Sequence, residues 1–189
     1  MGLEETITSI VIDDVLGNLF VSVPPGYIAC IYSRGKGVLP KILKPGLHLK
    51  VPFWHKAKLF NTQIQEYKIQ VGFDVENKKL IGDKEIVALT ADDREIMLEG
   101  TVLFRLNAQD ATKMWENIGD NFVEKIIKPI TRSRVRMIIS YYSMIDVLSH
   151  LGEIEKIIKQ ELQAPFLDKA IIVENVLIAH LAPKKEEKE

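Results

Sequence analysis

The chain has 189 residues, of which 47% are hydrophobic and 27% charged, and its formal net charge is −1. This length and apolar content suit one domain, or two small lobes with a shared core, and they exclude an intrinsically disordered protein. A single cysteine excludes a disulfide scaffold and leaves the redox compartment undetermined. The total charge favours no class of partner, but its distribution along the chain does.

The first 18 residues are expected to form a membrane-proximal segment that does not span a bilayer. Asp13 and Asp14 interrupt the apolar stretch 6–23, and each charge costs roughly 2.5–3.5 kcal/mol at the centre of a bilayer. Apolar residues nevertheless recur at helical spacing on one side of this stretch: Ile12, Val15, Leu16, Leu19, Phe20 and Val23. We expect this face to lie on or dip into a membrane. The alternative is a short helix or strand packed on the core.

Short strands separated by proline and glycine turns dominate the next part of the chain. The apolar runs and alternating patterns predict strands at 19–23, 27–32 and 47–51, and a longer one within 58–71. Residues 74–83 are polar and predict a loop. A hairpin follows, with arms at 86–90 and 95–106, and Asp92 and Asp93 supply its turn chemistry. Gly100 interrupts the second arm and predicts a bulge.

Helices follow the hairpin. A short one is predicted at 110–117, a second carries Pro129, which should bend or split it, and a third runs over 149–167. Residues 170–181 return to a strand that Pro183 ends. The order of strands, then helices, then one strand predicts an α+β fold. We divide the chain into the segment 1–18, a domain at 19–183 and a charged tail at 184–189, which is solvated or begins a longer helix.

The sequence lacks the residue patterns typical of catalysis or metal binding. None of the four histidines has a metal-ligand spacing, and Cys30 lies inside an apolar strand, where burial is expected. The stretch 34–37 (RGKG) has neither the spacing nor the context of a phosphate-binding loop. We therefore expect a non-enzymatic protein without a metal or a cofactor.

The strongest signal is a run of one charge sign near the start of the chain. From 15 to 65 there is no Asp or Glu, and the same stretch holds seven basic residues: Arg34, Lys36, Lys41, Lys44, Lys50, Lys56 and Lys58. The aromatic pair Phe53-Trp54 lies among them, and a tryptophan flanked by lysines is typical of an interfacial membrane anchor. We predict that one set of residues contacts an anionic membrane: Leu19, Phe20, Lys50, Phe53, Trp54, Lys56 and Lys58.

Two other interpretations of this cationic region stay open. One is a solvated basic β lobe with Trp54 in the core. The other is a nucleic-acid surface, which we disfavour because it would need several aromatic residues interleaved with the basic ones on one sheet face. We expect no nucleic-acid partner.

A second basic stripe lies on one face of the predicted second helix, at Lys125, Lys128, Arg132 and Arg136. Such a stripe is usually a solvated helix face. The alternative is contact with an acidic surface of a neighbouring identical subunit, which we predict as the oligomer contact.

Several motifs resemble the SPFH (stomatin–prohibitin–flotillin, or band-7) domain. The family pattern V-x-P-G-x-x-x-V, then P-G-x-H-x-x-x-P-F, is matched by Val23, Pro25, Gly26, Pro45, Gly46, His48, Pro52 and Phe53. The stretch 88–107 (ALTADDREIMLEGTVLFRLN) is similar to the family's hairpin and long strand. The stretch 111–140 is similar to its helical region, and 171–184 to its closing strand. The resemblance covers about residues 19–183 in the right order.

The resemblance implies an SPFH fold, with an N-terminal antiparallel β lobe, then helices and a closing C-terminal strand. It also implies a membrane-associated scaffold that assembles laterally into rings or cages, organises membrane microdomains, and modulates partners such as a membrane-anchored AAA protease or a channel. A soluble protein-binding adaptor without direct lipid contact is the alternative function.

Overall fold

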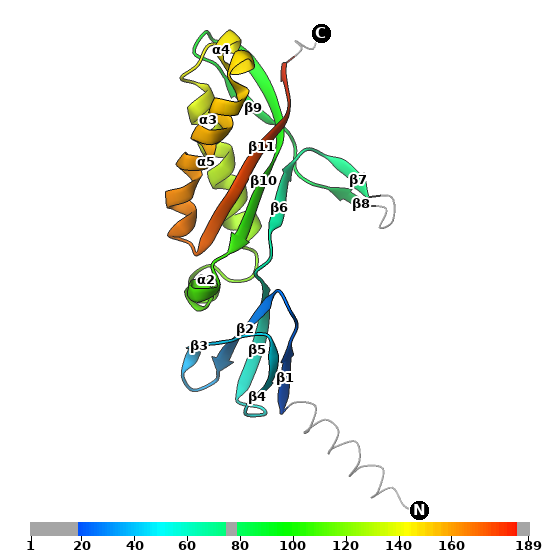
Figure 1. Ribbon diagram of the computed structural model, residues 1–189, viewed down its shortest axis with the longest axis vertical. Coiled ribbons are helices and arrows are strands. Elements are labelled where there is room, and N and C mark those ends of the chain that lie inside the picture. The colour runs from blue at the N-terminus through cyan, green and yellow to red at the C-terminus, as the bar shows by residue number, and fades with distance from the viewer. Residues whose placement is uncertain (1–18, 75–78, 185–189) are drawn as a thin grey trace, which may run out of the picture. The chain divides into compact units, whose positions relative to one another are not determined.

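The computed structural model describes residues 19–74 and 79–184, which fold into two compact units (Figure 1). Within the described residues, the first unit comprises 19–63 and 106–117, and the second comprises 64–105, without 75–78, and 118–184. The segment predicted at 1–18 lies outside the described residues, as does most of the charged tail. The described part contains no helix long and apolar enough to cross a bilayer.

The first unit contains a two-stranded ladder, a three-stranded antiparallel sheet and a short helix. The ladder joins β1 (Phe20–Val23) to β4 (Gly46–Leu49). The sheet has the order β3-β2-β5, from β3 (Gly37–Leu43), β2 (Tyr27–Ser33) and β5 (His55–Asn61). A 3-10 turn (Ala108–Asp110) and α2 (Ala111–Asn117) complete the unit.

The core of this unit lies between the ladder and one face of the sheet. It is built from Val21, Val23, Ala29, Ile31 and Leu43, with Tyr27, Leu39 and Ala57 packed against it. On the opposite face, the ring of Phe60 meets that of Trp115 from α2 edge-on, with centroids 5.9 Å apart. Residues of β2 are therefore buried on both faces, as the continuous apolar run 27–32 predicts.

The second unit is built around the long strand β10 (Glu95–Leu106). β10 pairs with β9 (Ile86–Leu89) along its first half and with β6 (Gln65–Ile69) along its second. β11 (Ile171–Pro183) is its other neighbour. A separate short ladder joins β7 (Gly72–Asp74) to β8 (Lys79–Ile81).

Helices cover one face of this sheet (Figure 1). They are the π-helical turn η2 (Val123–Ile127), α3 (Lys128–Ile139), α4 (Met144–Ser149) and α5 (Leu151–Leu167). Their buried apolar positions recur at helical spacing, and in α5 these are Ile154, Ile158, Leu162 and Phe166. Pro129 stands at the start of α3, directly after η2, and the two segments are continuous along the chain, so the helix is not split at Pro129. Proline has no N–H to donate to the preceding turn, which fits the change from π-helical to α-helical geometry at this point.

The predicted hairpin turn between β9 and β10 is confirmed, and it has a further role. The Thr90 hydroxyl donates to Asp92 Oδ1 at 2.7 Å, while the same oxygen accepts the backbone N–H of Met144 at 2.9 Å. Asp93 has φ 56°, the left-handed conformation that Asp tolerates in turns. These contacts attach the hairpin to the first residue of α4.

The strand pattern differs from the prediction in several places. Strand β3 is absent from the prediction because Pro40 and its neighbouring lysines break the apolar pattern. An edge strand tolerates such a proline, and the β2–β3 register does shift between Cys30 and Tyr32. The single strand expected within 58–71 is two strands, β5 and β6, in different sheets. The polar stretch expected as a loop at 74–83 contains part of the β7–β8 ladder.

The bulge expected at Gly100 is also wrong. Gly100 pairs in regular register with Ile69. A Cβ at this position would lie 2.4 Å from the carbonyl oxygen of Leu177 in β11. The residue is glycine because the backbone of β11 passes too close for any side chain. Glycine occupies this position because it has no side chain, and the strand ladder continues through it.

Candidate functional site

A strained turn at 51–55 presents two aromatic side chains at the start of β5. The N–H of Trp54 donates to the Pro52 carbonyl at 2.7 Å, and the N–H of His55 donates to the Val51 carbonyl at 3.0 Å. Phe53, at the centre of the three-residue turn, has φ 61°. A bulky residue with positive φ is uncommon and costs of the order of 1–3 kcal/mol, a strain that often marks functional positions.

Backbone hydrogen bonds hold this turn against two other parts of the first unit. The N–H of Arg34, in the turn between β2 and β3, donates to the Trp54 carbonyl at 3.0 Å. The N–H of Lys50 donates to the Leu19 carbonyl at 2.9 Å, next to the start of β1. Three loops or strand ends that are distant in sequence therefore meet at one end of this unit.

Large apolar side chains are exposed at this end. Phe53 is 71% exposed and Trp54 59%. Phe20 lies opposite Leu49 in the β1–β4 ladder, so both side chains share the face that does not contact the core. The exposed apolar set, which we call the apolar tip, comprises Phe20, Leu47, Leu49, Val51, Phe53 and Trp54. Such a group is informative because soluble proteins seldom leave contiguous large apolar surface in water.

The interpretation that placed Trp54 in the core is wrong. The other tryptophan, Trp115, is partly buried, and its ring packs edge-on against that of Phe60. The sequence indicated Phe53 and Trp54 as surface anchors, and both are exposed. It did not indicate that Leu47 and Leu49 are exposed, because in an alternating strand such residues are expected to face the core. Their exposure follows only from the pairing of β4 with β1.

A hollow of about 350 Å³ lies beside the apolar tip. It is lined by Arg34, Lys50, Phe53, His55, Lys56 and Ala57. In the described part of the chain, none of the ion pairs involves Arg34, Lys50 or Lys56. The backbone N–H of Val51 donates to His55 Nδ1 at 3.4 Å, which assigns the proton of a neutral ring to Nε2. The hollow thus gathers cationic groups without a carboxylate.

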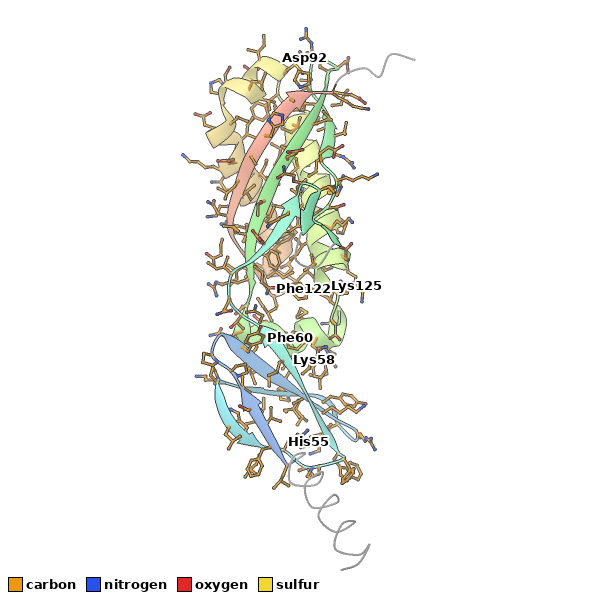
Figure 2. All side chains as sticks on the ribbon, turned by 90° about the vertical axis from the view of Figure 1, so that its right-hand side faces the viewer. His55, Lys58, Phe60, Asp92, Phe122 and Lys125 are labelled. Carbon is orange, nitrogen blue, oxygen red and sulfur yellow. The ribbon has the colours of Figure 1, made fainter. Side chains whose placement is uncertain are left out.

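The seven residues predicted as membrane contacts separate into two groups. Phe20, Lys50, Phe53, Trp54 and Lys56 lie at the apolar tip or line the hollow, and the Leu19 backbone borders it. Lys58 is not among the lining residues of the hollow; it lies opposite Cys30 in the β2–β5 pairing, on the sheet face that also carries Lys56 and Phe60. Figure 2 shows Lys58 close to Phe60, with His55 at the far end of the strand. Arg34 and His55 are lining residues that the prediction missed.

The basic stripe of the second unit has partners within the chain. Arg132 donates to the carbonyls of Lys84 at 2.7 Å and Glu85 at 3.0 Å, and Arg136 donates to that of Val87 at 3.0 Å. Lys128 pairs with Asp83 at 3.1 Å, and Lys125 donates to the Ile118 carbonyl at 2.8 Å. The two arginines thus satisfy backbone carbonyls in β9 and in the two residues before it. An additional contact with a neighbouring copy stays a prediction.

Asp83 is the centre of a partly buried polar cluster. Its carboxylate accepts from the Tyr67 hydroxyl at 2.8 Å and pairs with Lys128. Burial opposes ionisation, but hydrogen bonds from Tyr67 and Lys128 hold the pKa of Asp83 below its usual value. Burial, together with the Asp83 carboxylate, raises the pKa of Tyr67. Every charge in this cluster is matched, which fits a structural link between β6, the residues before β9, and α3.

Groups suited to chemistry are sparse in the described residues. Cys30 is fully buried, as expected, and burial raises its pKa to about 11, so the thiol stays protonated at neutral pH. Across 19–74 and 79–184, no three His, Cys, Asp or Glu side chains gather into a cluster that would hold a metal ion. The apolar tip and the hollow beside it are the surface features that most require a functional explanation.

Comparison with known proteins yields a family and distant relatives. The model of the SPFH domain / Band 7 family matches residues 21–189. The chain is 22% identical to Prohibitin-2 of Mus musculus over 87% of its length, and 19% identical to Prohibitin 1 of Mus musculus over 91%. It is 22% identical to Prohibitin-1 of Colletotrichum higginsianum over 91%. The matches span 50%, 58% and 57% of those proteins, so the chain spans about half of their length.

Proposed function

Because the chain belongs to the SPFH domain / Band 7 family, we propose that it is a non-enzymatic scaffold domain that associates with a membrane through the apolar tip. Copies of the domain assemble side by side, organise membrane microdomains, and modulate membrane proteins or proteases. The membrane carries anionic lipid, because the hollow beside the tip is cationic. The chain has the α+β fold of the SPFH domain, and the first unit of this fold carries the apolar tip.

The observation that carries the proposal is the exposure of Phe53 and Trp54 on a strained turn. Full burial of one large apolar side chain contributes roughly 1.5–3 kcal/mol. Phe53 is 71% exposed, so most of this free energy is still available to a second apolar phase. Phe53 has a positive φ, a conformation that a glycine would adopt without strain. The headgroup region of a bilayer is a phase that accepts both aromatic rings and lysines.

Attraction between basic side chains and anionic lipid strengthens this binding, and lateral assembly of several copies strengthens it further. Each Lys or Arg near an anionic leaflet contributes about 1 kcal/mol. Arg34, Lys50 and Lys56 surround one hollow next to the apolar tip, so the same orientation of the domain serves both contributions. One copy would bind weakly and reversibly. Several copies in one assembly bind far more tightly, because each further contact is effectively intramolecular.

The direct test is flotation of the protein with vesicles of phosphatidylcholine alone and with added anionic lipid. We expect flotation with anionic vesicles and little with neutral ones. The variant Phe53→Ser/Trp54→Ser should lose flotation. The control Tyr141→Ser/Ile145→Ser removes two apolar side chains of similar exposure, 71% and 72%, from the second unit, and it should float like the wild type.

Two results would contradict the proposal. One is equal flotation of the tip variant and the control. The other is a protein that floats with none of these vesicles, also after chemical crosslinking into assemblies, but binds a partner protein in solution. The second result would favour the soluble adaptor.

A further inference from the structure

Resting on the proposed membrane function, we infer that the hollow lined by Arg34, Lys50, His55 and Lys56 is a specific site for the phosphomonoester headgroup of a lipid. The inference concerns recognition of one headgroup chemistry, not general attraction to negative charge. The hollow measures about 350 Å³, which lies at the lower end of the roughly 300–1,000 Å³ typical of small-molecule sites.

The cations of the hollow differ from the other basic cluster of this protein. On α3, Lys128 pairs with Asp83, and Arg132 and Arg136 are occupied by backbone carbonyls. The lining of the hollow contains no such carboxylate, and the sequence has no Asp or Glu between 15 and 65. Like charges held together repel each other, and an anion in the hollow removes that repulsion.

Strand pairing brings these groups together from different parts of the sequence. In the β2–β5 register, Ser33 lies opposite His55 and Tyr32 opposite Lys56, which places the neighbouring Arg34 beside the start of β5. The bond from the Lys50 N–H to the Leu19 carbonyl fixes the end of β4 at the same place. The donors therefore belong to a folded scaffold of backbone hydrogen bonds, as a selective site requires.

The chemistry of the donors fits a phosphomonoester. Such a group carries about −1.5 to −2 charges near neutral pH and offers three terminal acceptor oxygens. A phosphodiester headgroup has a single charge and two terminal oxygens. Arginine binds phosphate through its planar fork, while lysine acts as a compact charge. One arginine and two lysines around one hollow match three oxygens and a double charge.

The apolar side of the hollow, formed by Phe53, identifies the source of the phosphate as a lipid. Phe53 lines the hollow and also projects from the apolar tip. A phosphate bound in the hollow thus has an exposed aromatic ring beside it, where the glycerol and the first acyl carbons of a lipid can pack. A free phosphate gains nothing from this wall.

The test compares vesicles of equal surface charge. Phosphatidylcholine vesicles contain either phosphatidic acid, a phosphomonoester, or enough phosphatidylglycerol, a phosphodiester, to give the same zeta potential. We expect wild-type protein to bind the phosphatidic acid vesicles at least about tenfold more tightly, the equivalent of one charge-assisted hydrogen bond. In the variant Lys50→Gln/Lys56→Gln, this preference should fall to nearly none.

The matched control is Lys41→Gln/Lys44→Gln. It removes the same charge from β3 and the turn after it, in the same unit but outside the hollow. It should weaken binding to both kinds of vesicle and keep the preference for phosphatidic acid. Equal binding of the wild type to both vesicles, or equal loss of preference in both variants, would overturn the inference while leaving membrane association intact.

A separate arm measures inorganic phosphate by calorimetry without vesicles. We expect it to bind at least about tenfold more weakly than the vesicle phosphomonoester, because the contact with Phe53 is missing. Binding of equal strength would make the hollow a site for free phosphate and overturn its assignment to lipid. Failure to bind any vesicle would refute the proposed function itself.

Discussion

The substitution Phe53→Gly separates the strain of the turn from its function. Positive φ at a non-glycine residue costs of the order of 1–3 kcal/mol, which glycine relieves. Glycine also gives the unfolded chain more conformational freedom, which costs about 0.5–1 kcal/mol. Phe53 buries less than a third of its surface, so its packing contributes under about 1 kcal/mol. The net change in the free energy of unfolding should therefore stay within about 1 kcal/mol of zero or favour the variant.

Membrane binding by the same variant should fall clearly. The exposed 71% of Phe53 corresponds to roughly 1–2 kcal/mol of unused burial, or about a five- to thirtyfold change in the vesicle dissociation constant. Urea unfolding measures the stability, and vesicle sedimentation measures the binding. The variant Tyr141→Ser serves as the control for loss of an equally exposed aromatic residue. The reasoning is refuted if Phe53→Gly binds as the wild type does, or if it loses more than about 2 kcal/mol of stability.

Three further predictions concern the second unit. Gly100→Ala should destabilise the protein by at least about 2 kcal/mol in urea unfolding, because its Cβ would collide with the Leu177 carbonyl. The control is Gly152→Ala on α5, where an added Cβ meets no atom within 4 Å; this variant should be neutral or stabilising by up to about 1 kcal/mol. Equal changes in the free energy of unfolding for the two glycine variants would contradict the packing argument. Arg132→Ala exposes two backbone carbonyls next to β9 and should lower stability by about 1–3 kcal/mol, whereas no change in the unfolding midpoint would show that water replaces the guanidinium. The pKa of Asp83 is lowered in the folded state, so the ionised carboxylate stabilises the fold above the unfolded pKa of about 4, and this stabilisation disappears as the pH falls through the folded pKa. Asp83→Asn should therefore have a lower melting temperature than the wild type at neutral pH, and its melting temperature should fall less between neutral and acidic pH. Melting temperatures that change with pH in parallel for both proteins would contradict this.

The sequence predicted the strands that have a clear apolar pattern and missed those without one. The run 27–32 and the alternation in 95–106 indicate β2 and β10 because both strands are buried in their sheets. Strand β3 is an edge strand with Pro40 inside it, and its stability comes from pairing with β2. The break between β5 and β6 is equally hidden, because the composition of 58–71 stays β-prone across it. Pairing between distant segments decides both cases.

The candidate site was predictable in its aromatic part and less so in its charged part. Phe53 and Trp54 follow a proline and are flanked by lysines, a local pattern that indicates an exposed anchor. Arg34 reaches the same place only through the register of β2 with β5, which no local pattern encodes. The basic stripe on α3 was visible in the sequence, but its partners were not. Its arginines bind backbone carbonyls, and these acceptors leave no trace in the side-chain sequence.

The orientation of the domain on the membrane is tested most directly by the depth of Trp54. The chain has two tryptophans, and Trp115→Phe leaves Trp54 as the single emitter, with an aromatic ring still packed against Phe60. On vesicles with brominated acyl chains, we predict a blue-shifted emission of Trp54 and strong quenching. The companion variant Trp54→Phe, which retains Trp115, should show neither. Unchanged emission of Trp54 in protein fully bound to vesicles would contradict the account, because another surface would then face the lipid.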